Sequence, residues 1–118
     1  MEIYDPWCHL PDGAQVIRTT LAQAPAYTDG QATIWLDTGL TQAEARCALT
    51  HELIHLEHGH DGHQEPRIEA RVRREAARRL VTPIIGRLCP DDDPVVWAEE
   101  QQITVAVLLD WIRTEAGR

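Results

Sequence analysis

The chain has 118 residues, of which 43% are hydrophobic and 25% charged, and its formal net charge is −8. This length suffices for one domain with a modest core, so we expect a single domain over residues 1–118. The negative charge disfavours direct nucleic-acid binding, and no segment is long and apolar enough to suggest a membrane span. The first residues do not resemble a signal peptide, and the three cysteines lack metal-type pairing, so we expect a cytoplasmic protein.

The first part of the chain carries strand signals. Residues 15–20 are rich in β-branched side chains and predict a strand. Residues 26–28 and 31–36 predict a hairpin that turns at Asp29-Gly30. We therefore expect a small antiparallel sheet before the first long helix.

A capped helix is predicted to follow. Thr41 and Glu44 have the spacing of a capping box, in which Thr41 is the N-cap and the Glu44 side chain reaches back to it. The helix should run to about Glu57. Its apolar residues surround the helix instead of forming one stripe, which predicts that it is buried.

The remaining elements are mostly helical. Glycines and a proline predict a loop over 58–66, and a second helix should run from about Pro66 to Val81. After a short apolar segment at 84–88, we expect a final helical pair at 95–101 and 105–115, capped by Asp92 or Asp93 and by Thr104. Few cations lie in this pair, so it should pack on the core instead of binding DNA.

The segment His51-Glu52-Leu53-Ile54-His55 carries the strongest chemical signal. Residues four apart share one face of a helix, so His51 and His55 can direct two imidazoles at one metal ion. Glu52 can reach a water near that ion without binding the ion itself. Zinc lowers the pKa of water to about 7, and a nearby base completes the chemistry of hydrolysis. The pattern therefore predicts two zinc ligands and a general base, Glu52.

A protein zinc site of this kind needs a third ligand. One source is the loop that contains His58, His60 and His63. The other is the second helix, where Glu69 falls within the predicted buried face and Glu75 lies at its edge. Each glutamate also has an arginine neighbour at helical spacing, Arg73 for Glu69 and Arg71 or Arg79 for Glu75, so a surface ion pair is the alternative. Spacing alone favours Glu69 slightly, and Glu75, His60 and His63 remain open as alternatives.

With these features the chain resembles the ImmA/IrrE metallopeptidases, small zinc proteins of bacteria, phages and mobile elements. The resemblance lies in segments 33–37, 40–55, 69–72 and 76–80. It implies a minimal zincin-like α+β domain over 1–88, with the helical pair of 94–116 packed on it. It also implies that zinc is held by His51, His55 and a glutamate of the next helix, which Glu69 matches best. The family's commoner Phe-Ala and Leu-Leu-Met-Pro are replaced here by Ala76-Ala77 and Leu80-Val81-Thr82-Pro83.

The resemblance further implies a zinc-dependent endopeptidase that acts on a helix-turn-helix transcriptional repressor in the cytoplasm of a bacterial host. The alternative is a non-catalytic anti-repressor that keeps the zinc fold and acts by binding. A ligand set of two histidines and one glutamate also tolerates manganese.

Peptide hydrolysis makes two further demands on the site. A donor besides zinc must stabilise the developing oxyanion, and Tyr27, His58, His60 and His63 are candidates, of which we select Tyr27 and His60. The substrate must also be held in an extended form, which we expect at the edge of the strand over 32–36.

Overall fold

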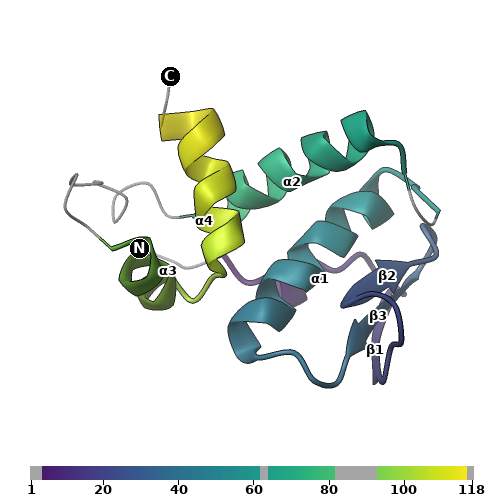
Figure 1. The fold of residues 1–118 in the computed structure, drawn as a ribbon. Coiled ribbons are helices and arrows are strands. Elements are labelled where there is room, and N and C mark those ends of the chain that lie inside the picture. The colour runs from purple at the N-terminus through teal and green to yellow at the C-terminus, as the bar shows by residue number, and fades with distance from the viewer. Residues whose placement is uncertain (1–3, 62–63, 82–92, 117–118) are drawn as a thin grey trace.

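The computed structural model describes residues 4–61, 64–81 and 93–116. These residues form an α+β fold with a three-stranded mixed sheet and four α-helices (Figure 1). In Figure 1, α1 (Gln42–Glu57) lies between the sheet and α2 (Pro66–Leu80), and it contacts both. The helix that carries the two histidines is therefore the central element of the fold.

The sheet consists of β1 (Gln15–Thr19), β2 (Ala26–Thr28) and β3 (Thr33–Asp37), in the order β1-β3-β2. β2 runs antiparallel to β3, as the hairpin prediction requires, but β1 runs parallel to β3. The expectation of an antiparallel sheet is therefore wrong for β1. The chain reverses direction twice between β1 and β3, and the hairpin puts β2 on one edge of β3, so β1 pairs with the other edge in the same direction as β3.

The hairpin loop is longer than a two-residue Asp-Gly turn. The backbone N–H of Asp29 donates to the carbonyl of Thr33 at 3.3 Å, which leaves residues 30–32 as the loop. The Asp29 carboxylate accepts the N–H groups of Gln31, Ala32 and Thr33 at 2.9, 3.0 and 3.1 Å. These bonds, those from Gln31 and Thr33 above all, lower the pKa of Asp29 and fix the shape of the loop.

α1 has the predicted capping box. The N–H of Glu44 donates to the Thr41 hydroxyl at 3.1 Å, and the N–H of Thr41 donates to the Glu44 carboxylate at 2.8 Å. The helix is buried on two sides, as its apolar pattern predicts. Leu49 and Leu53 pack against the sheet, while Ile54 packs against α2 and the C-terminal helices. Burial on both sides fixes the direction in which the histidines point.

The C-terminal pair consists of α3 (Pro94–Gln101) and α4 (Val105–Trp111), followed by a π-helical turn over Ile112–Ala116. Asp93 and Thr104 cap the two helices, as predicted. α4 packs on α2, and Trp97 of α3 is buried in the same cluster. No helix in the described part of the chain has the length and apolarity needed to cross a membrane. The apolar segment predicted at 84–88 lies outside the described residues.

A buried arginine on α1 ties these parts together. The Arg46 guanidinium donates to the carbonyl of Tyr4 at 2.8 and 3.1 Å. It also donates to the carbonyls of Gln101 and Gln102 at 3.1 and 3.0 Å, in the turn between α3 and α4. Because a buried charge requires such partners, Arg46 fixes the N-terminal segment (which includes the 3-10 turn Pro6–His9) and the helical pair against α1.

Candidate metal centre

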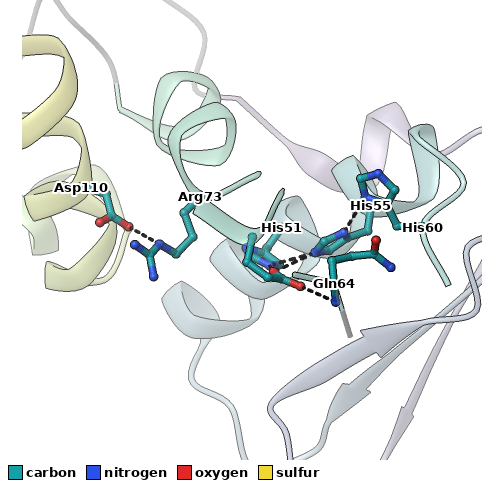
Figure 2. Close-up of polar contacts among 7 residues, drawn as sticks. His51, His55, His60, Gln64, Arg73 and Asp110 are labelled. Atoms are coloured by element: carbon teal, nitrogen blue, oxygen red, sulfur yellow. Dashed lines mark hydrogen bonds and ion pairs between the residues drawn. The ribbon is translucent and has the colours of Figure 1, made fainter. Parts of the chain in front are cut away.

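His51 and His55 lie one helical turn apart on the same face of α1, and their Nε2 atoms are 3.2 Å apart (Figure 2). Their environments differ. The His55 side chain is 4% exposed, whereas that of His51 is 26% exposed. The helix therefore directs both rings to one point, with one ring buried and the other partly open to solvent.

Glu69, in the first turn of α2, supplies the third group. Its Oε1 atom lies 3.2 Å from Nε2 of His51 and 3.1 Å from Nε2 of His55. Its Oε2 atom accepts the backbone N–H of Gln64 at 3.3 Å, which orients the carboxylate (Figure 2). The packing of α2 on α1 thus brings a carboxylate to the two imidazoles.

These three atoms fit a metal ion. Their mutual distances are 3.1–3.2 Å, and tetrahedral zinc with bonds of about 2.0–2.1 Å would separate its ligand atoms by about 3.3–3.4 Å. Hydrogen bonds alone account less well for this triangle of two Nε2 atoms and one Oε1 atom. Each Nε2 atom carries at most one proton, so the two imidazoles can supply hydrogen bonds for at most two of the three contacts. Among the described residues, His51, His55 and Glu69 form a group that can hold a metal ion.

The local electrostatics favour the protonation states that metal binding needs. Burial, and then the charge of His55, lower the pKa of His51 and favour its neutral form. Partial burial opposes ionisation of Glu69, but the charge of His55 and the hydrogen bonds from Gln64 and the two histidines outweigh it and lower the pKa. A neutral imidazole and an ionised carboxylate are both ready to act as ligands.

Glu52 lies next to His51 on α1 and is half-buried. Burial, with a smaller contribution from the charge of Glu69, raises the pKa of Glu52 to about 7. A carboxyl group with such a pKa can both accept and return a proton near neutral pH.

A cavity of about 470 Å³ opens beside His51 and Glu52. It is bounded by α1, α2, α4 and the segment that leads into β2, and small or apolar side chains form most of its wall. It can therefore receive an apolar group next to the metal centre.

Arg73 lies in the wall of this cavity, one helical turn after Glu69 on α2. Its side chain is 57% exposed, and its Nε atom lies 3.8 Å from Oδ2 of Asp110 on α4, which is too long for a hydrogen bond (Figure 2). From the sequence, Arg73 is expected only as an exposed ion-pair partner of Glu69. The same spacing puts it on the face of α2 that carries the ligand, which is the signal that could have identified it.

Glu75, the alternative third ligand, lies elsewhere. Its side chain is 41% exposed, and its Oε2 atom accepts the Nε–H of Arg79 at 3.1 Å. Arg79 in turn donates to the Glu57 carboxylate of α1 at 2.7 and 3.1 Å. The surface pairing considered for both glutamates is thus present for Glu75, while Glu69 faces the histidines.

The two selected oxyanion donors, Tyr27 and His60, do not face the centre of the triangle. Tyr27 points to the opposite side of the sheet from α1 and stacks on Trp35, with ring centroids 4.6 Å apart. His60 contacts His55 through Nδ1, on the side of the ring away from Glu69. His58 stacks on His60, and His63 lies outside the described residues.

The chain was also compared with known proteins. No protein-family model matches it, and neither a curated protein nor a solved structure does. The residues and their geometry therefore carry the functional argument.

Proposed function

We propose that the chain is a zinc-dependent endopeptidase built on a minimal zincin-like domain. The observation that carries this proposal is the convergence of His51, His55 and Glu69 beside a cavity whose wall contains Glu52. Three protein ligands on one side and an open space on the other are typical of catalytic zinc sites, whereas structural zinc sites have four protein ligands.

Each residue has a role in this proposal. Zinc, when bound by His51, His55 and Glu69, would polarise a peptide carbonyl and increase the acidity of a water molecule. Glu52 accepts a proton from the attacking water and returns it to the leaving amine. Arg73, in the same cavity wall, stabilises negative charge that develops on the carbonyl oxygen.

The free edge of β2 suits an extended substrate. β3 is the central strand, so neither of its edges is available, which rules out the edge expected from the sequence. On either side of β2, the Pro25 carbonyl accepts the Asp37 N–H of β3 and the Asp29 N–H donates to the Thr33 carbonyl of β3. Because backbone groups point to alternate sides along a strand, those of Ala26 and Thr28 point away from β3, toward the free edge. Pro25 and Ala26 also border the cavity, so a peptide added to this edge would run beside His51.

For the substrate, we propose a regulatory protein, in particular a helix-turn-helix repressor in a bacterial cytoplasm. This part rests on the resemblance noted in the sequence. Because most of the cavity wall is apolar, we expect an apolar side chain next to the peptide bond that is cut.

The test is an unbiased search for new protein N-termini. A bacterial proteome is incubated with the zinc-loaded protein, with Glu52→Gln, and with the protein plus a chelator, and N-termini are identified by labelling and mass spectrometry. We expect cleavage sites that depend on both zinc and Glu52. Zinc binding without any such site would contradict the enzymatic proposal, and repressor binding unchanged by Glu52→Gln would then support a non-catalytic anti-repressor.

A further inference from the structure

His60 contacts the ring of His55 on the side opposite the proposed metal centre. His55 directs Nε2 at His51 and Glu69, and its other ring nitrogen, Nδ1, lies 3.0 Å from Nδ1 of His60. Figure 2 shows the His60 ring beyond that of His55, joined to it by this contact. His60 is therefore placed to act on the metal centre through His55 without touching the ion.

The contact determines how protons are distributed over the two rings. A ligating nitrogen cannot carry a proton, so a metal-bound His55 has its proton on Nδ1. That N–H then donates to His60, which must accept with an unprotonated Nδ1 and carry its own proton on Nε2. A histidine that ligates zinc almost always has such an acceptor behind it, usually a carboxylate, a carbonyl or water.

The backbone holds His60 in this position. Gly59 adopts a left-handed conformation with φ of +69°, which turns the chain back at the end of α1. The N–H of His60 then donates to the carbonyl of His55 at 2.9 Å. On the other side Gly30 of the hairpin loop approaches closely, since a Cβ atom there would lie 2.5 Å from the His60 carbonyl oxygen. Two glycines and one hydrogen bond thus fix the residue that faces His55.

We propose that His60 is a positioning residue that holds His55 in its Nδ1–H tautomer and fixes the ring for metal binding. The inference rests on the metal centre proposed above. It replaces the role of oxyanion donor that the sequence suggested for His60, because a group on the Nδ1 side of His55 lies away from the point where the three ligand atoms converge.

The experiment compares zinc affinities, measured by competition with a chromophoric chelator, for the parent protein and three variants. His60→Leu keeps the bulk and removes the acceptor, so we expect a 10- to 100-fold loss of affinity, the usual effect of losing an outer-shell partner. His60→Asn presents its amide oxygen to the Nδ1–H of His55 in place of the ring nitrogen and should stay within about threefold of the parent. His58→Leu is the control, because the His58 ring stacks on His60 and its bond to the His55 carbonyl comes from the backbone, which the substitution keeps. It should also stay within about threefold of the parent.

Nitrogen-15 NMR of the zinc-loaded protein gives a second readout, in which His55 should be protonated at Nδ1 in the parent. Unchanged affinity in His60→Leu, or an equal loss in His58→Leu, would each overturn the positioning role while leaving the metal centre intact. A His55 ring protonated at Nε2 would overturn both the positioning role and the metal centre, because a ligating nitrogen carries no proton. Failure of the parent protein to bind zinc at all would overturn both proposals.

Discussion

The two histidines of α1 belong to two different halves of the site. On the Nδ1 side of His55 the site is closed. The His55 side chain is 4% exposed, His60 contacts its Nδ1 atom, and Gly30 of the hairpin loop packs against the His60 carbonyl. Around His51 the site is open. The His51 side chain is 26% exposed, and it lines one cavity together with Glu52 and Arg73. We call these the closed half and the open half.

This difference would let one helix hold an ion and leave it accessible. A ligand that must stay in one orientation benefits from burial and a fixed partner, because both restrict its ring. Groups that must meet a substrate have to remain beside a space that the substrate can enter. We therefore expect substitutions in the closed half to affect the stability of the fold and those in the open half to affect hydrolysis.

Removal of the histidines should separate the halves most strongly. His55→Ala and His51→Ala should each lower zinc affinity by more than about 100-fold, because a direct ligand matters more than an outer-shell group. Only His55→Ala should also destabilise the metal-free protein, by about 2 kcal/mol, because its ring is buried and hydrogen-bonded. For His51→Ala we expect less than about 1 kcal/mol. Urea unfolding in the presence of chelator measures both values, and equal losses would contradict the division.

Within the open half, Glu52→Gln should abolish hydrolysis and spare the metal. Because glutamine cannot accept the proton of the attacking water, we expect hydrolysis to fall about 1000-fold. Zinc content should stay the same, since Glu52 is not part of the ligand group. Hydrolysis of an identified substrate peptide, with zinc content measured in parallel, checks both statements. A fully active Glu52→Gln would remove the general base from the mechanism.

Arg73→Ala should lower hydrolysis about 100-fold with zinc content unchanged, as expected for loss of one donor to a developing oxyanion. Arg74→Ala is the matched control, because Arg74 is an exposed neighbour on α2 that does not line the cavity. The measurement is kcat for the same peptide. If both variants lost activity equally, the charge of α2, and not the position of Arg73, would be responsible.

The smallest effect concerns Asp29, whose carboxylate shapes the loop behind the closed half. Its pKa is lowered from 3.8 in the folded protein, so it stabilises the fold above about pH 3.8 and this contribution disappears as the pH falls through the lower folded pKa. Asp29→Ala should therefore be less stable than the parent at pH 7 and pH 5, and the gap should shrink at pH 3. Urea midpoints at these pH values, with exposed Asp12→Ala as control, test this, and a gap that widens on acidification would contradict it.

Local patterns predicted α1 and the shared face of its two histidines, whereas features that depend on packing escaped them. The capping box and the apolar residues of α1 are local, so the helix and the shared face of its histidines followed from the sequence. Glu69 falls within the predicted buried face of α2 and Glu75 at its edge, and the way α2 crosses α1 determines that Glu69 faces the histidines. Strand order, the contact of His60 with His55 and the place of Arg73 likewise depend on contacts between distant segments.

The zinc content of the purified protein, measured by elemental analysis beside Glu69→Ala and Glu75→Ala, tests the metal centre directly. The two variants lose the same side chain from the same helix, but only Glu69 faces the histidines, while Glu75 pairs with Arg79. We predict about one zinc per chain in the parent and in Glu75→Ala, as expected for a single three-ligand site, and far less in Glu69→Ala. Two results would contradict this metal centre. One is a parent protein that contains no zinc after zinc is supplied, and the other is zinc that is lost in Glu75→Ala and kept in Glu69→Ala.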